Sequence, residues 1–178
     1  MIIKPWKILE TSHLHPSIRV DQCELSNGHK LDCHLLEYDD EIMVFALTKK
    51  QEVVLIKQYR HGVQQAILEL PGGSVDEGES PLEAAKRELM EETGYASDTW
   101  IEVGCASPNP AIYTNRIYSF LAMDAEKIGE QSAYDAENIE VFLFPLEEAI
   151  AMAKRGDLIH SLNVSTLFFV LEYLHRIS

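Results

Sequence analysis

The segment GGSVDEGESPLEAAKRELMEETGY constrains the fold more than any other part of the sequence. Ser80 is a typical N-cap residue, Pro81 suits the first helical position, and Glu83 completes a Ser-x-x-Glu capping box. Gly94 is the residue type that commonly ends a helix. These signals predict a short helix over residues 81–93, preceded by a glycine-containing loop.

The predicted helix has one acidic side and one apolar side. At about 100° per residue, Glu88, Glu91 and Glu92 fall within an arc of about 100°. The small Ala84 is expected inside this arc, where it leaves room between the acids. The apolar stripe that packs on a sheet is predicted to consist of Leu82, Ala85, Leu89 and Thr93.

The acidic side has one basic neighbour. Arg87 is expected at the edge of the arc, within i, i+4 reach of Glu83 and Glu91. Like charges at this spacing cost a helix roughly a few tenths of a kcal/mol per pair. The face is therefore either solvated, which charge spacing alone favours, or it binds a hard cation. Carboxylate oxygens without Cys or His favour Mg²⁺ or Mn²⁺.

The rest of the chain reads as strands with two further helices. Asn27-Gly28 lies between two runs of mixed apolar and polar residues, which predicts a hairpin. The pattern favours a mixed sheet sandwiched by helices, an α/β fold. The predicted strands span residues 41–48, 52–60 (paired with 41–48), 66–73, 100–107, 115–123 and 141–145, and the predicted helices span 145–155 and 162–175.

Composition excludes several classes of partner. The net charge of -14 and the pI near 4.8 argue against a nucleic-acid partner. The sequence has no signal-peptide pattern and no run long enough to span a membrane. The cysteines Cys23, Cys33 and Cys105 follow no metal-ligand spacing, nor do the seven histidines. Reduced thiols in a cytoplasmic protein are expected.

The acidic helix forms part of a longer motif. Gly73, then Glu79, then the run from Arg87 to Tyr95 matches G-x5-E-x7-R-E-U-x-E-E-x-G-U, where U is a bulky aliphatic residue. Only Tyr95 departs from this pattern. The chain thus resembles the Nudix hydrolases. The runs VVLIKQYR and LELPGG resemble the ADP-ribose pyrophosphatase branch of that superfamily.

The resemblance implies an architecture and a reaction. The expected fold is an α/β/α sandwich over residues 46–178, with an N-terminal antiparallel β-subdomain over residues 1–45. In this branch that subdomain reaches across a homodimer, although it can instead fold back on its own chain. Members cleave the P–O–P bond of a nucleoside diphosphate linked to another group. ADP-ribose, giving AMP and ribose 5-phosphate, is the first substrate expected.

By position, the resemblance also implies metal ligands, with Mg²⁺ expected and Mn²⁺ as the alternative. Glu88 and Glu92 would bind the metal directly, and Glu91 would share the metals or their waters as a catalytic residue. Arg87 would orient the glutamates. The backbone carbonyl of Gly72 would add another metal ligand. Glu79 would either hold the loop or bind a metal through water.

The general base in this branch often lies outside the motif. Glu137 is the first candidate, Asp135 and Glu140 are close rivals, and each is equally well explained as a solvated loop carboxylate. Arg60 either binds a substrate phosphate or base, or pairs with Glu69.

Substrate binding is expected to involve Glu69, Gly73 and two residues beyond the motif. Pro110, fifteen residues after Tyr95, stands where ADP-ribose enzymes carry a proline. Tyr113 stands where dinucleoside polyphosphate enzymes carry a tyrosine, and a strand-edge role explains it equally well. A GDP-sugar, a dinucleoside polyphosphate and a non-catalytic nucleotide-sugar sensor remain the alternative readings.

Overall fold

A computed structural model describes residues 7–132 and 139–176. The chain divides into two compact units, residues 1–39 with 107–116 and residues 40–106 with 117–178. The boundary thus falls between Asp39 and Asp40, because the strand that follows lies in the middle of the second unit's sheet. The assignment of separate domains at residue 45 stays a prediction.

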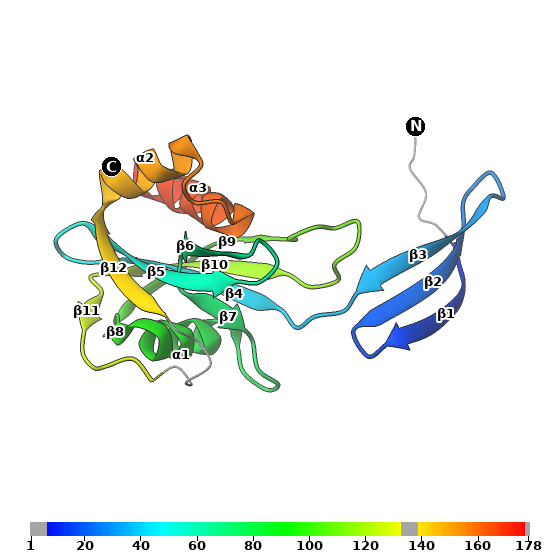
Figure 1. Cartoon of the computed structure of the whole chain (residues 1–178), viewed down its shortest axis with the longest axis horizontal. Coiled ribbons are helices and arrows are strands. Elements are labelled where there is room, and N and C mark those ends of the chain that lie inside the picture. Colours follow the sequence, from blue (N-terminus) through cyan, green and yellow to red (C-terminus); the bar gives the residue numbers. More distant parts are fainter. Residues whose placement is uncertain (1–6, 133–138, 177–178) are drawn as a thin grey trace. The chain divides into compact units, whose positions relative to one another are not determined.

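The first unit is built on a three-stranded antiparallel sheet in the order β1-β2-β3 (Figure 1). The predicted hairpin joins β2 to β3, and Gly28 adopts the left-handed φ of 81° that its turn requires. The segment 107–116 joins this unit, where Leu36 N donates to Ile112 O at 2.6 Å. The strands are β1 (Lys7–His15), β2 (Ile18–Glu24) and β3 (Lys30–Leu36).

The second unit contains a seven-stranded mixed sheet with the main order β12-β5-β4-β10-β9. Strands β4 and β10 run parallel, whereas the other neighbours run antiparallel. A short pair, β8 with β11, lies outside this sheet and had no sequence signal. The bounds are β4 (Glu41–Leu47), β5 (Glu52–Arg60), β8 (Tyr95–Ala96), β9 (Thr99–Ala106), β10 (Ile117–Met123), β11 (Glu126–Lys127) and β12 (Glu140–Pro145).

Helices cover both faces of this sheet, which confirms the α/β/α sandwich (Figure 1). Helix α1 (Pro81–Thr93) packs on one face, in a core that includes Ala85 and Leu89. Helices α2 (Leu146–Arg155) and α3 (Ser161–Arg176) pack on the other face. Within the described ranges, no helix is both long enough and apolar enough to cross a membrane.

Strands β4 and β5 pair as expected, and their register is confined to Leu47 and Val53. Beyond that point β6 (Gln65–Glu69) pairs with β5, and β7 (Gly72–Ser74) pairs with β4. The intervening Pro71 carbonyl accepts from Val44 N at 2.8 Å. The segment from β6 to β7 therefore fills the split between two diverging strands.

Helix α1 has the predicted ends but a rotated apolar face. The capping box between Ser80 and Glu83 is present, and Gly94 is the left-handed C-cap. Ala84 is buried, as is Glu92 of the acidic arc, whereas Leu82 is 36% exposed rather than packed on the sheet. The prediction for Leu82 was wrong because the angular pattern does not say where the sheet lies.

The helix stop at Gly94 can be tested by substitution. Gly94 has φ 73°, and a Cβ there would lie 2.2 Å from Gly129 O, whereas Gly156 has φ 81° with nothing within 4 Å. We expect Gly156→Ala to cost about 1–2 kcal/mol from left-handed strain alone. Gly94→Ala should cost about 1–3 kcal/mol more, because a backbone atom must also move. Urea unfolding measures the loss of unfolding free energy in both variants. Equal losses would show that the contact with Gly129 O is removed at no cost.

Candidate active site

Helix α1 is joined to the β6–β7 segment through Glu92. Its side chain is buried, and Oε2 accepts a hydrogen bond from Gly72 N at 2.9 Å. Asn or Gln at position 92 can also accept this bond, but only a carboxylate brings a charge to the loop. The predicted contribution of the Gly72 carbonyl to metal binding stays a prediction.

The next glycine makes room for a second carboxylate. A Cβ on Gly73 would lie 2.4 Å from Glu88 Oε1, so any side chain at this position would displace the carboxylate. Glu88 is mostly buried, with 16% of its side chain exposed. The motif therefore needs glycine here for space, since the loop backbone and the helix carboxylate are in close contact.

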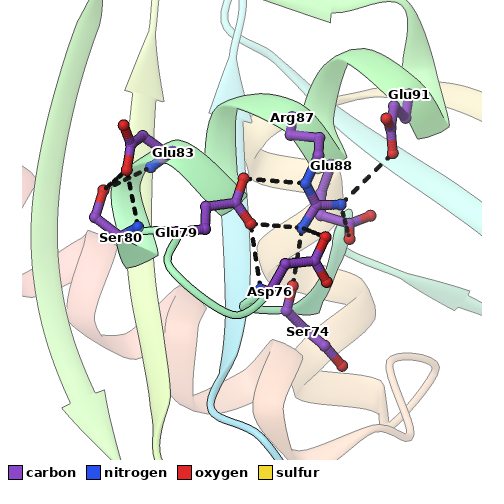
Figure 2. A network of polar contacts seen from close by, with 8 residues as sticks. All are labelled: Ser74, Asp76, Glu79, Ser80, Glu83, Arg87, Glu88 and Glu91. Carbon is purple, nitrogen blue, oxygen red and sulfur yellow. Dashed lines mark hydrogen bonds and ion pairs between the residues drawn. The ribbon is translucent and has the colours of Figure 1, made fainter.

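Arg87 is the centre of the polar network at this site (Figure 2). Its Nε and Nη2 donate to the two oxygens of Glu79 at 3.1 and 2.9 Å. Its Nη1 donates to Glu88 Oε1 at 2.6 Å and lies 3.6 Å from Glu91 Oε2. Nη2 also donates to Ser74 O at 3.0 Å. One guanidinium thus orients three acids and the end of β7.

This network differs from the sequence expectation at one contact. Glu83 was expected to pair with Arg87, but its carboxylate accepts from both Ser80 N and Ser80 Oγ in the capping box. Glu79 takes its place beside Arg87 and also accepts from Asp76 N at 3.3 Å, so it holds the loop before the helix. The prediction of an Arg87–Glu83 pair was wrong, because capping the helix uses Glu83.

The charges of this network stabilise one another. The hydrogen bond from Arg87 lowers the pKa of Glu79 below its usual range. The hydrogen bond to Glu79 raises the pKa of Arg87, against the opposing effect of burial, and Glu88 adds to the rise. Both partners are therefore charged at neutral pH.

The acids of α1 have the chemistry of a hard-metal site. Glu88 and Glu92 offer carboxylate oxygens beside the glycine backbone, Glu91 offers another on the same helix, and such oxygens suit divalent cations. Gly73 leaves the space through which Glu88 reaches that backbone. Among residues 7–132 and 139–176, no three acidic, His or Cys side chains converge as a ready set of ligands. The donors fit a divalent cation by type, with Arg87 holding Glu88 and Glu91 nearby.

A second charged group lies at the end of β5. Arg60 Nε donates to Glu69 Oε2 at 2.6 Å, so the pairing expected as one alternative does form. Glu69 is only 1% exposed, whereas the Arg60 side chain is 45% exposed. Within the described parts of the chain, Nη1 and Nη2 of Arg60 make no hydrogen bond. Arg60 is thus held through Nε, and its side chain remains partly open to solvent.

Sequence reasoning missed the partner on the other side of Glu69. His160 Nδ1 lies 2.7 Å from Glu69 Oε1, although the ring N–H is not aligned as in a standard hydrogen bond. Burial alone would raise the pKa of Glu69, but His160 and Arg60 outweigh it and lower the pKa. No local motif marks His160, because its partner is distant in the sequence.

Asn163 is a second residue that the sequence reasoning missed. This fully buried side chain of α3 accepts from Leu70 N at 3.0 Å, and its Nδ2 donates to Leu68 O at 3.4 Å. A polar residue on the apolar side of a helix was the available signal. Asn163 thereby ties α3 to the segment that carries Glu69.

Gln131 connects the end of α1 to the residue that precedes β12. Its Nε2 donates to Glu92 O at 2.6 Å and to Ile139 O at 3.2 Å. Of the three candidate bases, Glu137 and Asp135 lie outside the described residues. Glu140 is the exposed first residue of β12 and pairs in the sheet with Lys57.

The two residues beyond the motif belong to the first unit. Pro110 is exposed, and Tyr113 is half-buried with its ring 5.8 Å from that of Tyr38. The other predicted site residues described here lie in the second unit. The contribution of Pro110 and Tyr113 to substrate binding stays a prediction.

Comparisons with known proteins agree with this description. A family model described as NUDIX domain matches residues 37–162. ADP-ribose pyrophosphatase of Bacillus subtilis (strain 168) is 28% identical, covering 76% of this chain and 74% of that protein. GDP-mannose pyrophosphatase of Citrobacter koseri is 31% identical, covering 73% and 70%. A crystal structure of an ADP compounds hydrolase has a TM-score of 0.88 at 24% identity, covering 100% of this chain and 98% of that one.

The family match covers more than half of the sequence, and the chain therefore belongs to the Nudix family. The expectation of a Nudix hydrolase is confirmed. The structural likeness supports the same fold. Nudix hydrolases in general need a divalent metal.

The contact between Gly73 and Glu88 generates a prediction about activity. Gly73→Ala should lower turnover about 10²-fold or more, because it displaces a carboxylate that must be placed within about 0.5 Å. Gly62→Ala is the matched control, since a Cβ there meets nothing within 4 Å. The rate of pyrophosphate-bond hydrolysis and the melting temperature are measured for both variants. Normal turnover in folded Gly73→Ala would contradict the assigned role of Glu88.

Proposed function

We propose that this chain is a Mg²⁺-dependent pyrophosphatase of nucleoside diphosphate sugars, with ADP-ribose as its substrate and AMP and ribose 5-phosphate as products. The observation that carries the proposal is the placement of Glu88 and Glu92 against the glycine loop, with Arg87 fixing the acids around them. The ADP-ribose pyrophosphatase named among the relatives supports the choice of sugar nucleotide.

The proposed metal ligands are Glu88 and Glu92, with Glu91 sharing the metals or their waters. A bound divalent cation supplies positive charge that offsets the charge of the diphosphate. Mg²⁺ is preferred because it binds through a few carboxylates and substrate phosphates, and Mn²⁺ accepts the same donors. Arg87 and Glu79 hold these acids in place.

The hydrolysis itself needs a phosphate anchor and a base. Arg60 presents two free guanidinium nitrogens, which suit two phosphate oxygens. Water attacks one phosphorus, its proton passes to a carboxylate, and the bond from that phosphorus to the bridging oxygen breaks. The bridging oxygen leaves with the other phosphate. Glu137 is the proposed proton acceptor, with Asp135 and Glu140 as alternatives.

A second substrate is supported by a specific finding. The GDP-mannose pyrophosphatase relative is 31% identical, slightly more than the ADP-ribose relative at 28%. Both substrates are nucleoside diphosphates linked to a sugar, so the metal and Arg60 would serve either of them. The choice between guanine and adenine depends on the base pocket, for which Tyr113 and Pro110 are the proposed contributors.

The proposed assembly is a homodimer in the cytoplasm. The described residues of the first unit form three strands, and few of their side chains are buried, which fits a sheet completed by another copy. All three cysteines are free, in keeping with a reducing compartment.

The substrate and metal assignment is tested with one panel and one variant. AMP or GMP release is measured from ADP-ribose, GDP-mannose, diadenosine polyphosphates and nucleoside triphosphates, with and without Mg²⁺. We expect Mg²⁺-dependent release of AMP from ADP-ribose. Glu92→Gln should lower turnover by about 10²-fold or more, while folding survives because glutamine still accepts from Gly72 N. If the wild-type protein hydrolyses none of these substrates, a non-catalytic nucleotide-sugar sensor would be favoured.

The base is tested by comparing three neutral variants. Glu137→Gln should lower turnover by about 10²–10⁴-fold, the usual contribution of a general base. Asp135→Asn and Glu140→Gln should remain within a few-fold of wild type and serve as matched controls. The pH dependence of kcat is recorded for each variant. Full activity in all three would assign proton transfer to a residue of the motif itself.

A further inference from the structure

We propose that His160 is a positioning residue for the substrate-phosphate contact and that it acts on Arg60 through Glu69. This inference rests on the proposed function, because it concerns the phosphate anchor of the same site. His160 itself would touch neither substrate nor metal. It would hold the buried carboxylate that in turn holds the guanidinium.

The three side chains form a continuous line of contacts. Arg60 Nε lies 2.6 Å from Glu69 Oε2, and His160 Nδ1 lies 2.7 Å from the other oxygen, Oε1. Each carboxylate oxygen thus has one partner. A carboxylate held at a single oxygen can turn about its last torsion, whereas one held at both cannot, so His160 limits the freedom of Glu69.

The burial of Glu69 makes the second partner important. A buried carboxylate loses its hydration, and nearby positive charge offsets part of that loss. Glu69 is 1% exposed, so its charge depends on protein partners rather than on water. Glu41 is another acid that His160 and Arg60 act on. Burial raises its pKa against the opposing charges of His160 and Arg60.

The backbone around Glu69 is also held by the start of α3. Asn163 contacts Leu70 N and Leu68 O, on both sides of Glu69. Leu68 packs toward the α2–α3 core, whereas Glu69 points away from solvent toward His160. The end of β6, the start of α3 and the Arg60–Glu69 ion pair are therefore connected by hydrogen bonds and salt bridges.

The position of Arg60 affects how it can bind a substrate phosphate. The described contacts of Arg60 use Nε alone, which leaves Nη1 and Nη2 for an anion. A guanidinium fixed through Nε loses less conformational freedom when it binds phosphate than one on a free side chain. Loss of His160 should therefore weaken substrate binding more than it slows the chemical step.

A double-mutant cycle tests this inference with ADP-ribose and Mg²⁺. His160→Leu removes the nitrogen at similar size, and Arg60→Ala removes the guanidinium. We expect His160→Leu to raise KM about 5–10-fold with kcat within about 2-fold of wild type. Arg60→Ala should raise KM further, and adding His160→Leu to it should change KM less than about 2-fold.

A conservative variant of His160 and a variant of its neighbour test whether His160 positions Arg60 or only stabilises the fold. His160→Asn keeps an N–H near the position of Nδ1 and should restore KM to within about 2-fold of wild type. Ile159→Ala, at the exposed neighbouring residue, is the matched control and should leave KM unchanged. Should His160→Leu fail to fold, His160→Gln, which moves its donor away from Glu69, goes through the same cycle.

Each outcome of the cycle assigns the failure to one proposal. If His160→Leu raises KM by the same factor with and without Arg60, His160 acts independently and the inference is overturned. If Arg60→Ala leaves KM unchanged, the phosphate contact of the proposed function is wrong and the inference falls with it. An unchanged KM in folded His160→Leu, with KM raised in Arg60→Ala, rejects the role of His160 alone.

Discussion

The close contact between the carboxylates of α1 and the glycine backbone of β7 is the constraint on which the site depends. Glu92 accepts from Gly72 N, and Glu88 occupies the space that a side chain on Gly73 would fill. This contact is available because β4 and β5 diverge on the side of the Leu47–Val53 pair away from their turn, where β7 pairs with β4 and β6 pairs with β5. A regular hairpin of β4 and β5 would leave no edge for β7 to occupy.

Arg87 and Arg60 both bind acidic side chains in this region, but they use different numbers of their nitrogen atoms. Arg87 is saturated, since its three guanidinium nitrogens contact Glu79, Glu88 and the Ser74 carbonyl. Among the described contacts Arg60 is held through Nε alone, and its side chain is 45% exposed. The first arrangement suits orientation of acids, and the second suits capture of an anion. In a chain with a net charge of -14, such local arrangements decide where a phosphate can bind.

Local sequence signals predicted the elements of the second unit well, and long-range contacts less well. The capping box and Gly94 placed α1 correctly, because caps depend on residues within one turn. The packing of Leu82 on the sheet was misjudged, because helical periodicity does not show which part of the apolar side meets the sheet. Of the two partners predicted for Arg87, Glu91 was correct and Glu83 was wrong. Glu79 was missed because it lies in the loop, where helical spacing does not apply.

The sequence by itself determined the chemical type of the site: acids, glycines and one arginine at spacings that follow helix geometry and the Nudix motif. Only the tertiary structure decided which of these groups meet. The divided sheet, the contact of Glu88 with Gly73 and the placing of His160 beside Glu69 all join segments distant in the chain. Such pairings arise from strand order and helix docking, because the packing of the whole core, rather than any local preference, brings those side chains together.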